Sequence, residues 1–177
     1  MIETDRLIIR SWRESDRAPF AKMSADPQVM RFFPSTLSVA ESDHVVDKIE
    51  SYTKQQGMGF WAVEEKATQD FIGFIGLNRL AEDNGILPHS FVEIGWRLRA
   101  KSWGVGYATE GALGVLSYAK TLNISELYAF TALINAPSIR VMEKIGMHNT
   151  HQDFDHPKVD AGHRLQRHCL YKIFLNS

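Results

Sequence analysis

Two glycines, Gly104 and Gly106, stand one residue apart in the stretch WGVGYATEGALG, where an apolar strand pattern gives way to a helical one. Glycine allows a close approach of the backbone to a ligand, and the unpaired N–H groups at a helix N-terminus attract anions. A phosphate group therefore suits this turn. The spacing alone equally suits a plain turn from strand to helix, so both interpretations stay open at this point.

Two common phosphate-binding motifs do not match this stretch. A dinucleotide-binding fingerprint needs a third glycine where Thr109 stands, and Asn135 occupies the place of the acid that would bind the ribose. A P-loop needs a lysine where Ala112 stands. Neither a dinucleotide nor ATP is supported as the ligand.

The hydrophobic pattern predicts the elements that position the turn. Ser38 and Glu41 form a capping box, and the apolar period changes from two to that of a helix at Ala108. Strands are expected at residues 6–12, 60–65, 71–80, 91–98, 127–133, about 148–154 and 168–175, and helices from residue 13 to about 26, from 38 to about 56, from 108 and over 137–144. The order predicts a mixed α+β domain.

Composition and charge narrow the class of protein. The chain has 177 residues, of which 44% are hydrophobic, so a single domain over residues 1–177 is expected. The net charge is −1 and the 20 basic residues are scattered, which argues against a nucleic-acid partner. No apolar run approaches the ~20 residues that span a bilayer, no signal-peptide pattern is present, and the single cysteine, Cys169, lies in an apolar run. We expect a cytoplasmic protein without membrane contact.

Five of the seven histidines lie between His148 and His168. The segment has the pattern of strand and loop, and neither further cysteines nor clustered carboxylates complete a tetrahedral set. We therefore expect no metal site, and a polar loop between the last two strands.

Several motifs in a fixed order point to a known family. The segments ETDRLIIR, DPQVMRFFP, WGVGYATEG and NAPSIRVMEKIGM together resemble the GNAT superfamily of acyl-CoA-dependent N-acyltransferases, and within it the RimJ/RimL-type subgroup. The resemblance covers essentially the whole chain. It implies the GNAT fold, an α+β (α/β-type three-layer) arrangement in which a mixed, twisted central sheet of about seven strands is flanked by about four helices.

The resemblance also implies a co-substrate, acetyl-CoA. The loop from Lys101 to Thr109 would wrap its pyrophosphate, the strand end before the loop would pair with its pantetheine amides, and two residues of the last helix would lie near its thiol. The cofactor-binding residues implied in this way are Trp96, Arg97, Leu98, Lys101, Gly104, Val105, Gly106, Tyr107, Ala108, Thr109, Asn135 and Ser138. Lys101 stands where the family usually has glutamine or arginine.

Acyl transfer to an amine needs a base, and the thiolate that departs needs a proton. Glu93 lies on the opposite strand face from Val92 and Ile94 and is the expected base, although a solvated carboxylate or a pair with Arg97 would explain it equally. The tyrosine that often protonates the thiolate in this superfamily is replaced by Met142. In the RimJ/RimL-type pattern a serine takes that role, and Ser138 stands in its place unless it only caps its helix.

The expected reaction is acetylation of a primary amine, either a protein N-terminus or a small molecule, by direct attack in a ternary complex. An α-amino group has an ordinary pKa of about 7.7 to 8.0, so a weak carboxylate base is enough for it. The resemblance suggests that Phe32 and Phe33 shape the acceptor site. A non-catalytic acyl-CoA-binding module stays open as the alternative, as does a monomer or a homodimer.

Overall fold

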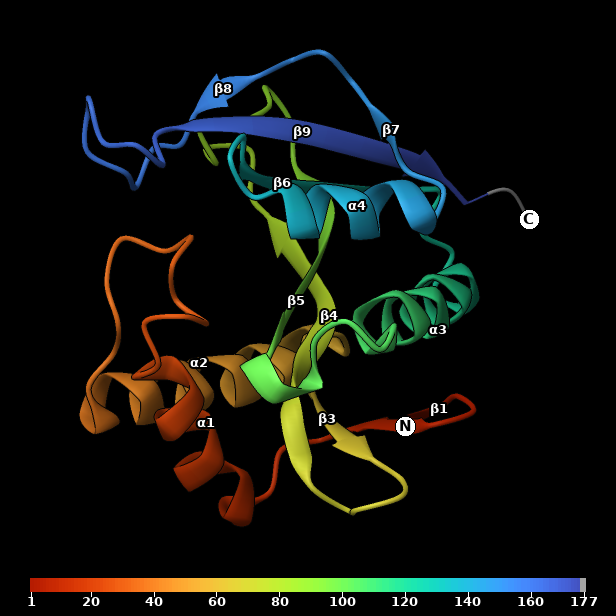
Figure 1. Cartoon of the computed structure of the whole chain (residues 1–177). Helices are drawn as coiled ribbons and strands as arrows, with labels where there is room; N and C mark the ends of the chain where they lie inside the picture. The colour runs from red at the N-terminus through yellow and green to blue at the C-terminus, as the bar shows by residue number, and fades with distance from the viewer. Residues whose placement is uncertain (176–177) are drawn as a thin grey trace. The chain divides into compact units, whose positions relative to one another are not determined.

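The computed structural model describes residues 1–175, and Figure 1 shows their course. The nine strands form a sheet in the order β1-β2-β3-β4-β5-β6-β9-β7, with β8 paired to β9. The strands are β1 (Ile2–Glu3), β2 (Leu7–Arg10), β3 (Phe60–Glu65), β4 (Phe71–Leu80), β5 (Phe91–Leu98), β6 (Glu126–Ala132), β7 (His148–Asn149), β8 (Phe154–Asp155) and β9 (Arg167–Phe174). The α-helices are α1 (Arg17–Ser24), α2 (Val39–Gln56), α3 (Tyr107–Thr121) and α4 (Ala136–Lys144), with short 3-10 turns at Glu14–Asp16 and Ala100–Ser102.

The mixed α+β class and the four helices are confirmed, whereas the number of strands is higher than the seven expected. Strand β1 has only two residues, too short to leave a periodic pattern in the sequence. The strand expected around residues 148–154 consists of β7 and β8, which pair with different parts of β9. Strands of two residues are defined by their partner and not by their own sequence.

The described chain divides into two compact units. Unit 1 comprises residues 1–77 and 95–115, and unit 2 comprises residues 78–94 and 116–177. Strands β4 and β5 and helix α3 continue from one unit into the other. The two units are described separately below.

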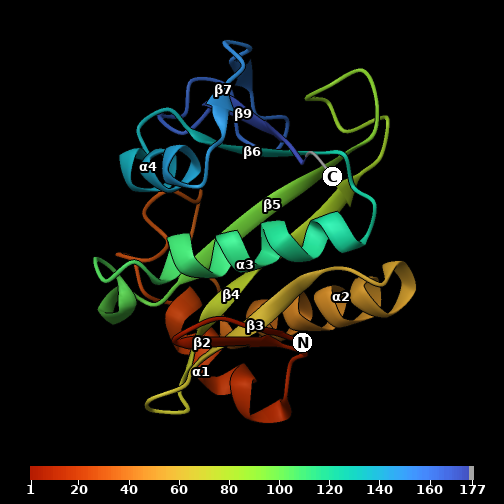
Figure 2. The ribbon, with the colours of Figure 1, turned by 90° about the vertical axis from the view of Figure 1, so that its right-hand side faces the viewer.

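In unit 1, helices cover both faces of an antiparallel sheet, as Figure 2 shows. Helices α1 and α2 pack through Phe20 and Val46 on the face that carries Phe74. The first turns of α3 pack on the other face, where a Cβ at Gly111 would lie 2.4 Å from Ile75. Because Phe74 and Ile75 are neighbours on β4, the alternation of side chains along a strand assigns one of them to each face.

Helix α2 begins and ends as its sequence predicts. The Ser38 hydroxyl accepts from the N–H of Glu41 at 3.3 Å, and the Glu41 carboxylate accepts from the N–H of Ser38 at 2.8 Å. Gly57 adopts a left-handed conformation at the C-terminal end, with φ of 69°. Both ends thus have their unpaired backbone groups satisfied locally.

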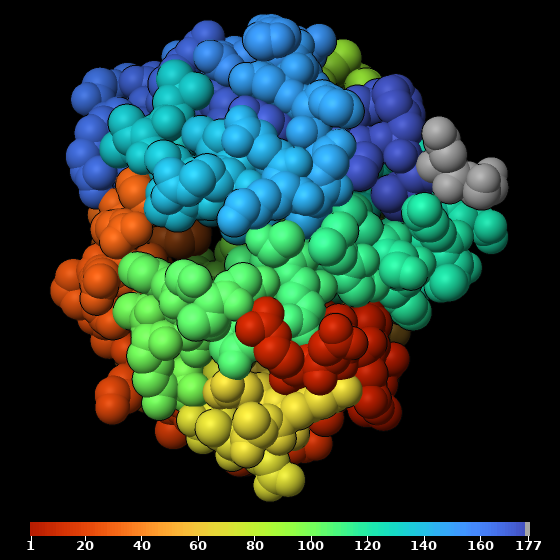
Figure 3. Space-filling view, turned by 45° about the vertical axis from the view of Figure 1, so that its right-hand side comes forward, coloured from red at the N-terminus to blue at the C-terminus, as the bar shows by residue number. Residues whose placement is uncertain are grey.

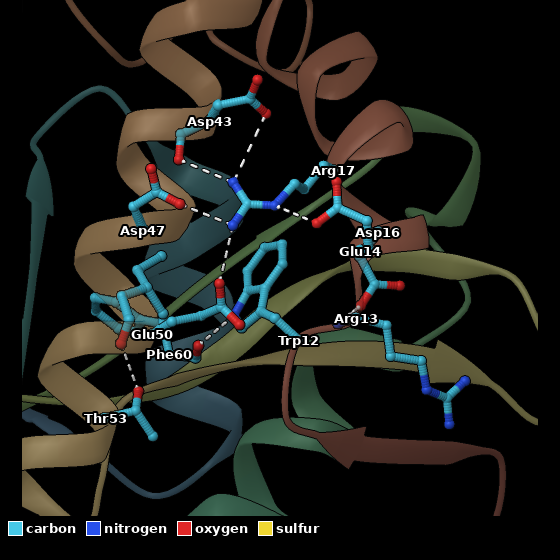
Figure 4. A network of polar contacts seen from close by, with 11 residues as sticks. Trp12, Arg13, Glu14, Asp16, Arg17, Asp43, Asp47, Glu50, Thr53 and Phe60 are labelled. Atoms are coloured by element: carbon cyan, nitrogen blue, oxygen red, sulfur yellow. Dashed lines mark hydrogen bonds and ion pairs between the residues drawn. The ribbon is translucent and has the colours of Figure 1, made fainter.

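Two arginines of unit 1 are surrounded by carboxylates. Arg17 joins α1 to α2 through Asp47 and Glu50 and also pairs with Glu14 in the turn before α1, as Figure 4 shows. Those three carboxylates are exposed, whereas Arg10 is buried together with two carboxylates, Asp16 and Glu64. The Arg10–Asp16 contact is 2.7 Å and bidentate. This buried cluster fixes the turn before α1 against the sheet.

In unit 2, β9 pairs with three other strands. It pairs antiparallel with β6 over seven residues, from Glu126↔Phe174 to Ala132↔His168, and also with β7 and β8. The parallel pair of β5 with β6, which the crossover through α3 predicts, is confirmed at Glu93↔Tyr128. Phe91, Tyr128 and Leu170 form a buried cluster.

None of the helices within residues 1–175 is long and apolar enough to cross a membrane.

We predict that Asp16→Ala lowers the free energy of unfolding by about 3 to 5 kcal/mol, because it leaves the buried charge of Arg10 undercompensated. Asp47→Ala removes the same side chain from the exposed network of Arg17 and should lower it by less than about 1 kcal/mol. Urea unfolding of the two variants measures the difference. An equal loss of unfolding free energy in the two variants would contradict the prediction that the buried ion pair matters more for stability than the exposed one.

Candidate functional site

The glycine turn before α3 presents backbone N–H groups to solvent. Gly104 and Gly106 have φ of 77° and 90°, and both are exposed. The N–H of Glu110 donates to the carbonyl of Gly106, so the N–H groups of the three preceding residues have no acceptor within the helix ladder. Addition of a Cβ at Gly104 would meet nothing within 4 Å. The turn can therefore offer several neighbouring donors to an anion.

Arg6 holds this turn in place. Its Nε lies 2.6 Å from Glu110 Oε2, its Nη1 donates to the carbonyl of Val105 at 3.0 Å, and its guanidinium lies 4.6 Å from the centre of the Tyr107 ring. The hydroxyl of Thr4 also donates to Glu110, at 2.6 Å. Figure 3 shows the green turn beside the red N-terminal segment. Arg6 adds positive charge where an anion would bind.

Neither the composition nor the spacing of residues singled out Arg6, although the sequence contains a signal for this role. Arg6 lies in the motif ETDRLIIR, and Glu110 lies in GYATEG, so two of the motifs that carried the resemblance meet in one ion pair.

The residues that lead into the turn are anchored on both sides. The indole of Trp103 donates to the carbonyl of Leu98 at 2.9 Å, and the side chain of Arg99 donates to Ser102 and to Asp70, at 3.0 Å each. Lys101 is exposed, and its Nζ lies 3.8 Å from Asp70. The backbone of the loop is thus held from residue 98 onward.

Glu93, the expected base, lies in unit 2 and is only partly exposed. Asn78 donates to Glu93 Oε1 at 2.8 Å. Burial raises the pKa of Glu93 to about 7, although the bond from Asn78 and the charge of Lys158 act in the opposite direction. The bond comes from Asn78, which the sequence analysis did not consider, and not from Arg97. A carboxylate with this pKa can accept a proton near neutral pH.

At α4, the sequence alternatives for Ser138 are separated by the geometry. The cap of the helix is Asn135, whose Oδ1 accepts from the N–H of Ser138 at 3.3 Å and whose Nδ2 donates to Thr131 at 2.8 Å. The alternative that Ser138 caps the helix is therefore wrong. Within residues 1–175 the Ser138 hydroxyl has no hydrogen-bond partner. The buried side chain of Met142 has no acidic proton, so its position offers no acid in place of the tyrosine.

The two phenylalanines expected at an acceptor site are each in contact with an arginine. Arg31 lies 4.9 Å from the ring centres of both Phe32 and Trp103. Arg97 lies 4.0 Å from the ring centre of Phe33, which is 38% exposed. Unit 1 thus contains the loop, the end of β5 and these two rings, whereas Glu93, Asn135 and Ser138 belong to unit 2.

The histidine-rich segment forms an aromatic cluster. The rings of His156 and His168 lie 4.7 Å apart, and both pack with Phe130 and Phe154. Burial lowers the pKa of His156 to about 4, so this imidazole is neutral at pH 7. Within residues 1–175, no group of three or more His, Cys, Asp or Glu side chains is arranged to hold a metal ion.

Known proteins match this chain both in sequence and in structure. The sequence profile of the family described as "Acetyltransferase (GNAT) domain" matches residues 6–148. Two relatives from Bacillus subtilis are "Uncharacterized protein YkkB", 33% identical over 82% of this chain and 83% of the relative, and "Uncharacterized N-acetyltransferase YoaA", 30% identical over 82% and 81%. The crystal structure of a GNAT-family acetyltransferase from Bacillus anthracis superposes with a TM-score of 0.82 at 25% identity, covering 99% of each chain.

More distant structures share the fold alone. An acetyltransferase from Salmonella typhimurium that modifies the N-terminal serine of ribosomal protein L7/L12 has a TM-score of 0.79 at 12% identity, covering 98% of this chain and 97% of that one. Spermidine N-acetyltransferase from Vibrio cholerae, solved with CoA and spermine, has a TM-score of 0.74 at 18% identity, covering 96% of each. Ribosomal-protein acetyltransferases, the type to which the motifs are similar, are thus among the structural neighbours.

We predict that Glu93 makes stability depend on pH. Its pKa of about 7 lies above the ordinary 4.5, so the folded protein binds more protons than the unfolded chain between these values, and stability from this group is lost as the pH rises from 4.5 through 7. The free energy of unfolding of the unchanged protein should fall by ~1 to 3 kcal/mol relative to Glu93→Gln over this range, at about 1.4 kcal/mol per pKa unit. Urea unfolding at several pH values measures this. A constant difference would contradict the raised pKa.

Proposed function

The chain belongs to the acetyltransferase (GNAT) family, and from this premise we propose that it transfers the acetyl group of acetyl-CoA to a primary amine by direct attack in a ternary complex. Members of this family are N-acetyltransferases, and the chain is an enzyme of this type. The finer proposal concerns its co-substrate, its acceptor and its residues. Residues 1–177 are proposed to act as one N-acetyltransferase domain.

The observation that carries the proposal is the glycine turn before α3. Gly104 and Gly106 take left-handed conformations, the first N–H groups of α3 are unpaired, and Arg6 lies beside them. A diphosphate is a dianion with oxygens that need several donors, and the turn offers backbone donors together with the helix dipole and a guanidinium. We assign the pyrophosphate of acetyl-CoA to the loop from Lys101 to Thr109.

The remaining assigned contacts follow the strand before this loop. Trp96, Arg97 and Leu98 form the end of β5, and their backbone is proposed to pair with the amides of the pantetheine arm. The carbonyl of Leu98 already accepts from Trp103, so one of its two lone pairs is left for this role. Trp103 thereby links the strand end to the loop.

Glu93 is the proposed general base. The neutral amine nitrogen attacks the thioester carbonyl carbon, the carbonyl oxygen becomes an oxyanion, and the amine proton passes to Glu93 directly or through a water. A pKa of about 7 gives Glu93 a sizeable ionised fraction at neutral pH and enough basicity to take the proton. Asn78 holds the carboxylate by one oxygen and leaves the other for the reaction.

The departing thiolate needs a proton when the C–S bond breaks. The Ser138 hydroxyl is proposed to donate a hydrogen bond to the sulfur while solvent completes the protonation, because a serine hydroxyl is by itself a poor acid. Asn135 supports this indirectly, since its amide caps α4 and so holds the N–H of Ser138 in place. The products are the N-acetylated amine and free CoA.

The acceptor is proposed to be a protein N-terminus or a small-molecule amine. Two distant proteins of the same fold act on such different acceptors, an N-terminal serine and spermidine, so the fold leaves the acceptor open. Phe32 and Phe33 are assigned to the acceptor site. Their contacts with Arg31 and Arg97 support a polar as well as an apolar surface there.

We predict that acetyl-CoA raises the melting temperature by several degrees, whereas NAD and ATP do not. At about 100 times the dissociation constant a ligand stabilises by about 2.7 kcal/mol, which is large enough for this readout. Gly106→Glu should abolish the rise, because it adds a negative side chain beside the turn. Gly162→Glu is the control, since Gly162 also has a positive φ but lies outside the loop; a Cβ would meet nothing within 4 Å at Gly162 and would lie 3.4 Å from Arg6 Nη2 at Gly106. A rise that persists in Gly106→Glu contradicts the assignment of the loop.

We further predict that kcat/KM rises with pH through an apparent pKa near 7 and that Glu93→Gln lowers kcat by about 100-fold or more, the usual contribution of a positioned base. The amine itself also titrates, so the profile should be measured with two acceptors whose amine pKa values differ. The step near 7 should remain in both and vanish in Glu93→Gln. A profile that follows only the pKa of the acceptor would exclude Glu93 as the base.

A further inference from the structure

The side chain of Arg97 is held against two phenylalanine rings of unit 1. Its guanidinium lies 4.0 Å from the centre of the Phe33 ring and 5.3 Å from that of Phe74. A guanidinium is planar and carries its five N–H donors around its edge, so contact with rings leaves these donors available. Contact with the two rings therefore restrains the side chain without satisfying its donors.

No anion within the described chain compensates this charge. Nε of Arg97 is buried and has no hydrogen-bond partner among residues 1–175, and no carboxylate of these residues lies within ion-pair distance of its guanidinium. Arg10 and Arg17 of the same unit are the contrast, because each lies within 3.1 Å of at least two carboxylates.

An unpaired buried cation is unfavourable by itself. Burial lowers the pKa of Arg97 to about 10, so the guanidinium is still positively charged at neutral pH. A buried charge and an unsatisfied N–H group each destabilise a fold unless a partner completes them. An anion from outside the chain would compensate the charge through the accessible part of the guanidinium.

We propose that Arg97 binds a carboxylate group of the acceptor, so that the enzyme acts on amines that also carry an acidic group. This inference rests on the proposed function. A guanidinium matches a carboxylate with two parallel N–H···O bonds, and the rings of Phe33 and Phe74 lie close enough to restrain the guanidinium that makes them. The proposed backbone contact of Arg97 with the pantetheine arm does not involve this side chain.

The anion is assigned to the acceptor and not to acetyl-CoA on chemical grounds. The pantetheine arm carries amide, hydroxyl and alkyl groups but no charge. The charged parts of CoA are the pyrophosphate, which is assigned to the loop from Lys101 to Thr109, and the 3′-phosphate of its adenosine, which lies beyond the pyrophosphate from the arm. Phe33, on which Arg97 stacks, is one of the two rings assigned to the acceptor site. The acceptor is therefore the substrate that can bring a carboxylate to Arg97.

The test uses amines that differ only in one charge, namely ω-amino acids of increasing chain length and the matching ω-amino amides. The carboxylate is remote from the amine in these probes, so the two members of a pair have similar amine basicity. For at least one chain length, kcat/KM should be about 10- to 100-fold higher for the acid, the size of a charge-assisted hydrogen-bond pair. Arg97→Gln should remove this preference, and the loss should appear mainly as a higher KM for the acid.

Arg167→Gln is the control, because Arg167 is an exposed arginine paired with Asp155 and its loss changes the net charge equally. It should keep the preference for the acid. Equal kcat/KM for acid and amide at every chain length in the unchanged enzyme would overturn the inference while leaving the acetyl transfer itself established.

Two measurements without turnover separate the remaining possibilities. The dissociation constant of CoA should be the same for Arg97→Gln and the unchanged protein, and a loss of CoA affinity would mean that the anion belongs to CoA. In the presence of CoA, the acid probe should raise the melting temperature more than its amide, and only when Arg97 is present. Because these readouts need no chemistry, they decide the role of Arg97 even if no probe is acetylated.

A purely structural role for Arg97 makes the opposite prediction for stability. Arg97→Met replaces an uncompensated buried cation by an apolar chain of similar length, so the melting temperature of the ligand-free protein should stay the same or rise. A clear fall would show that Arg97 serves the fold and would overturn the inference.

Discussion

The ion pair between Arg6 and Glu110 is the interaction on which the candidate donor site depends. A helix N-terminus binds an anion only if its first N–H groups stay unpaired, and unpaired groups do not hold a loop in place. The side chains of Arg6 and Glu110 supply that restraint from outside the turn. Within the turn, Arg6 donates to the carbonyl of Val105, so this contact occupies none of the backbone N–H groups. The amides of the turn are thereby kept free and fixed at the same time.

Compensation of charge distinguishes the residues that build the fold from those proposed to act on substrates. Arg10 and Arg17 are matched by carboxylates that come from neighbouring elements of unit 1. Among residues 1–175, neither Glu93 nor Arg97 has an ion-pair partner within 4 Å, and burial shifts the pKa of each towards the neutral form. Perturbed groups of this kind are concentrated at functional sites, which is the physical reason for assigning roles to both.

The histidines show how a tertiary environment changes the meaning of a residue type. Their spacing in the sequence invites a metal hypothesis, yet His156 and His168 stack against each other and against aromatic rings. Burial lowers the pKa of both imidazoles and so favours their neutral form. Their packing joins the segment that carries His156 to His168 of β9.

The sequence by itself determined the local features of this protein and its family. The capping box at Ser38, the four helices and the glycine turn depend on neighbours in the chain, and the ordered motifs were enough to recognise a GNAT acetyltransferase. Only the tertiary structure decided that Asn78 binds Glu93 and that Arg97 has no carboxylate partner among residues 1–175. Hydrogen bonds between strands and the loss of solvent around a charge arise from residues far apart in sequence, so no local pattern contains them.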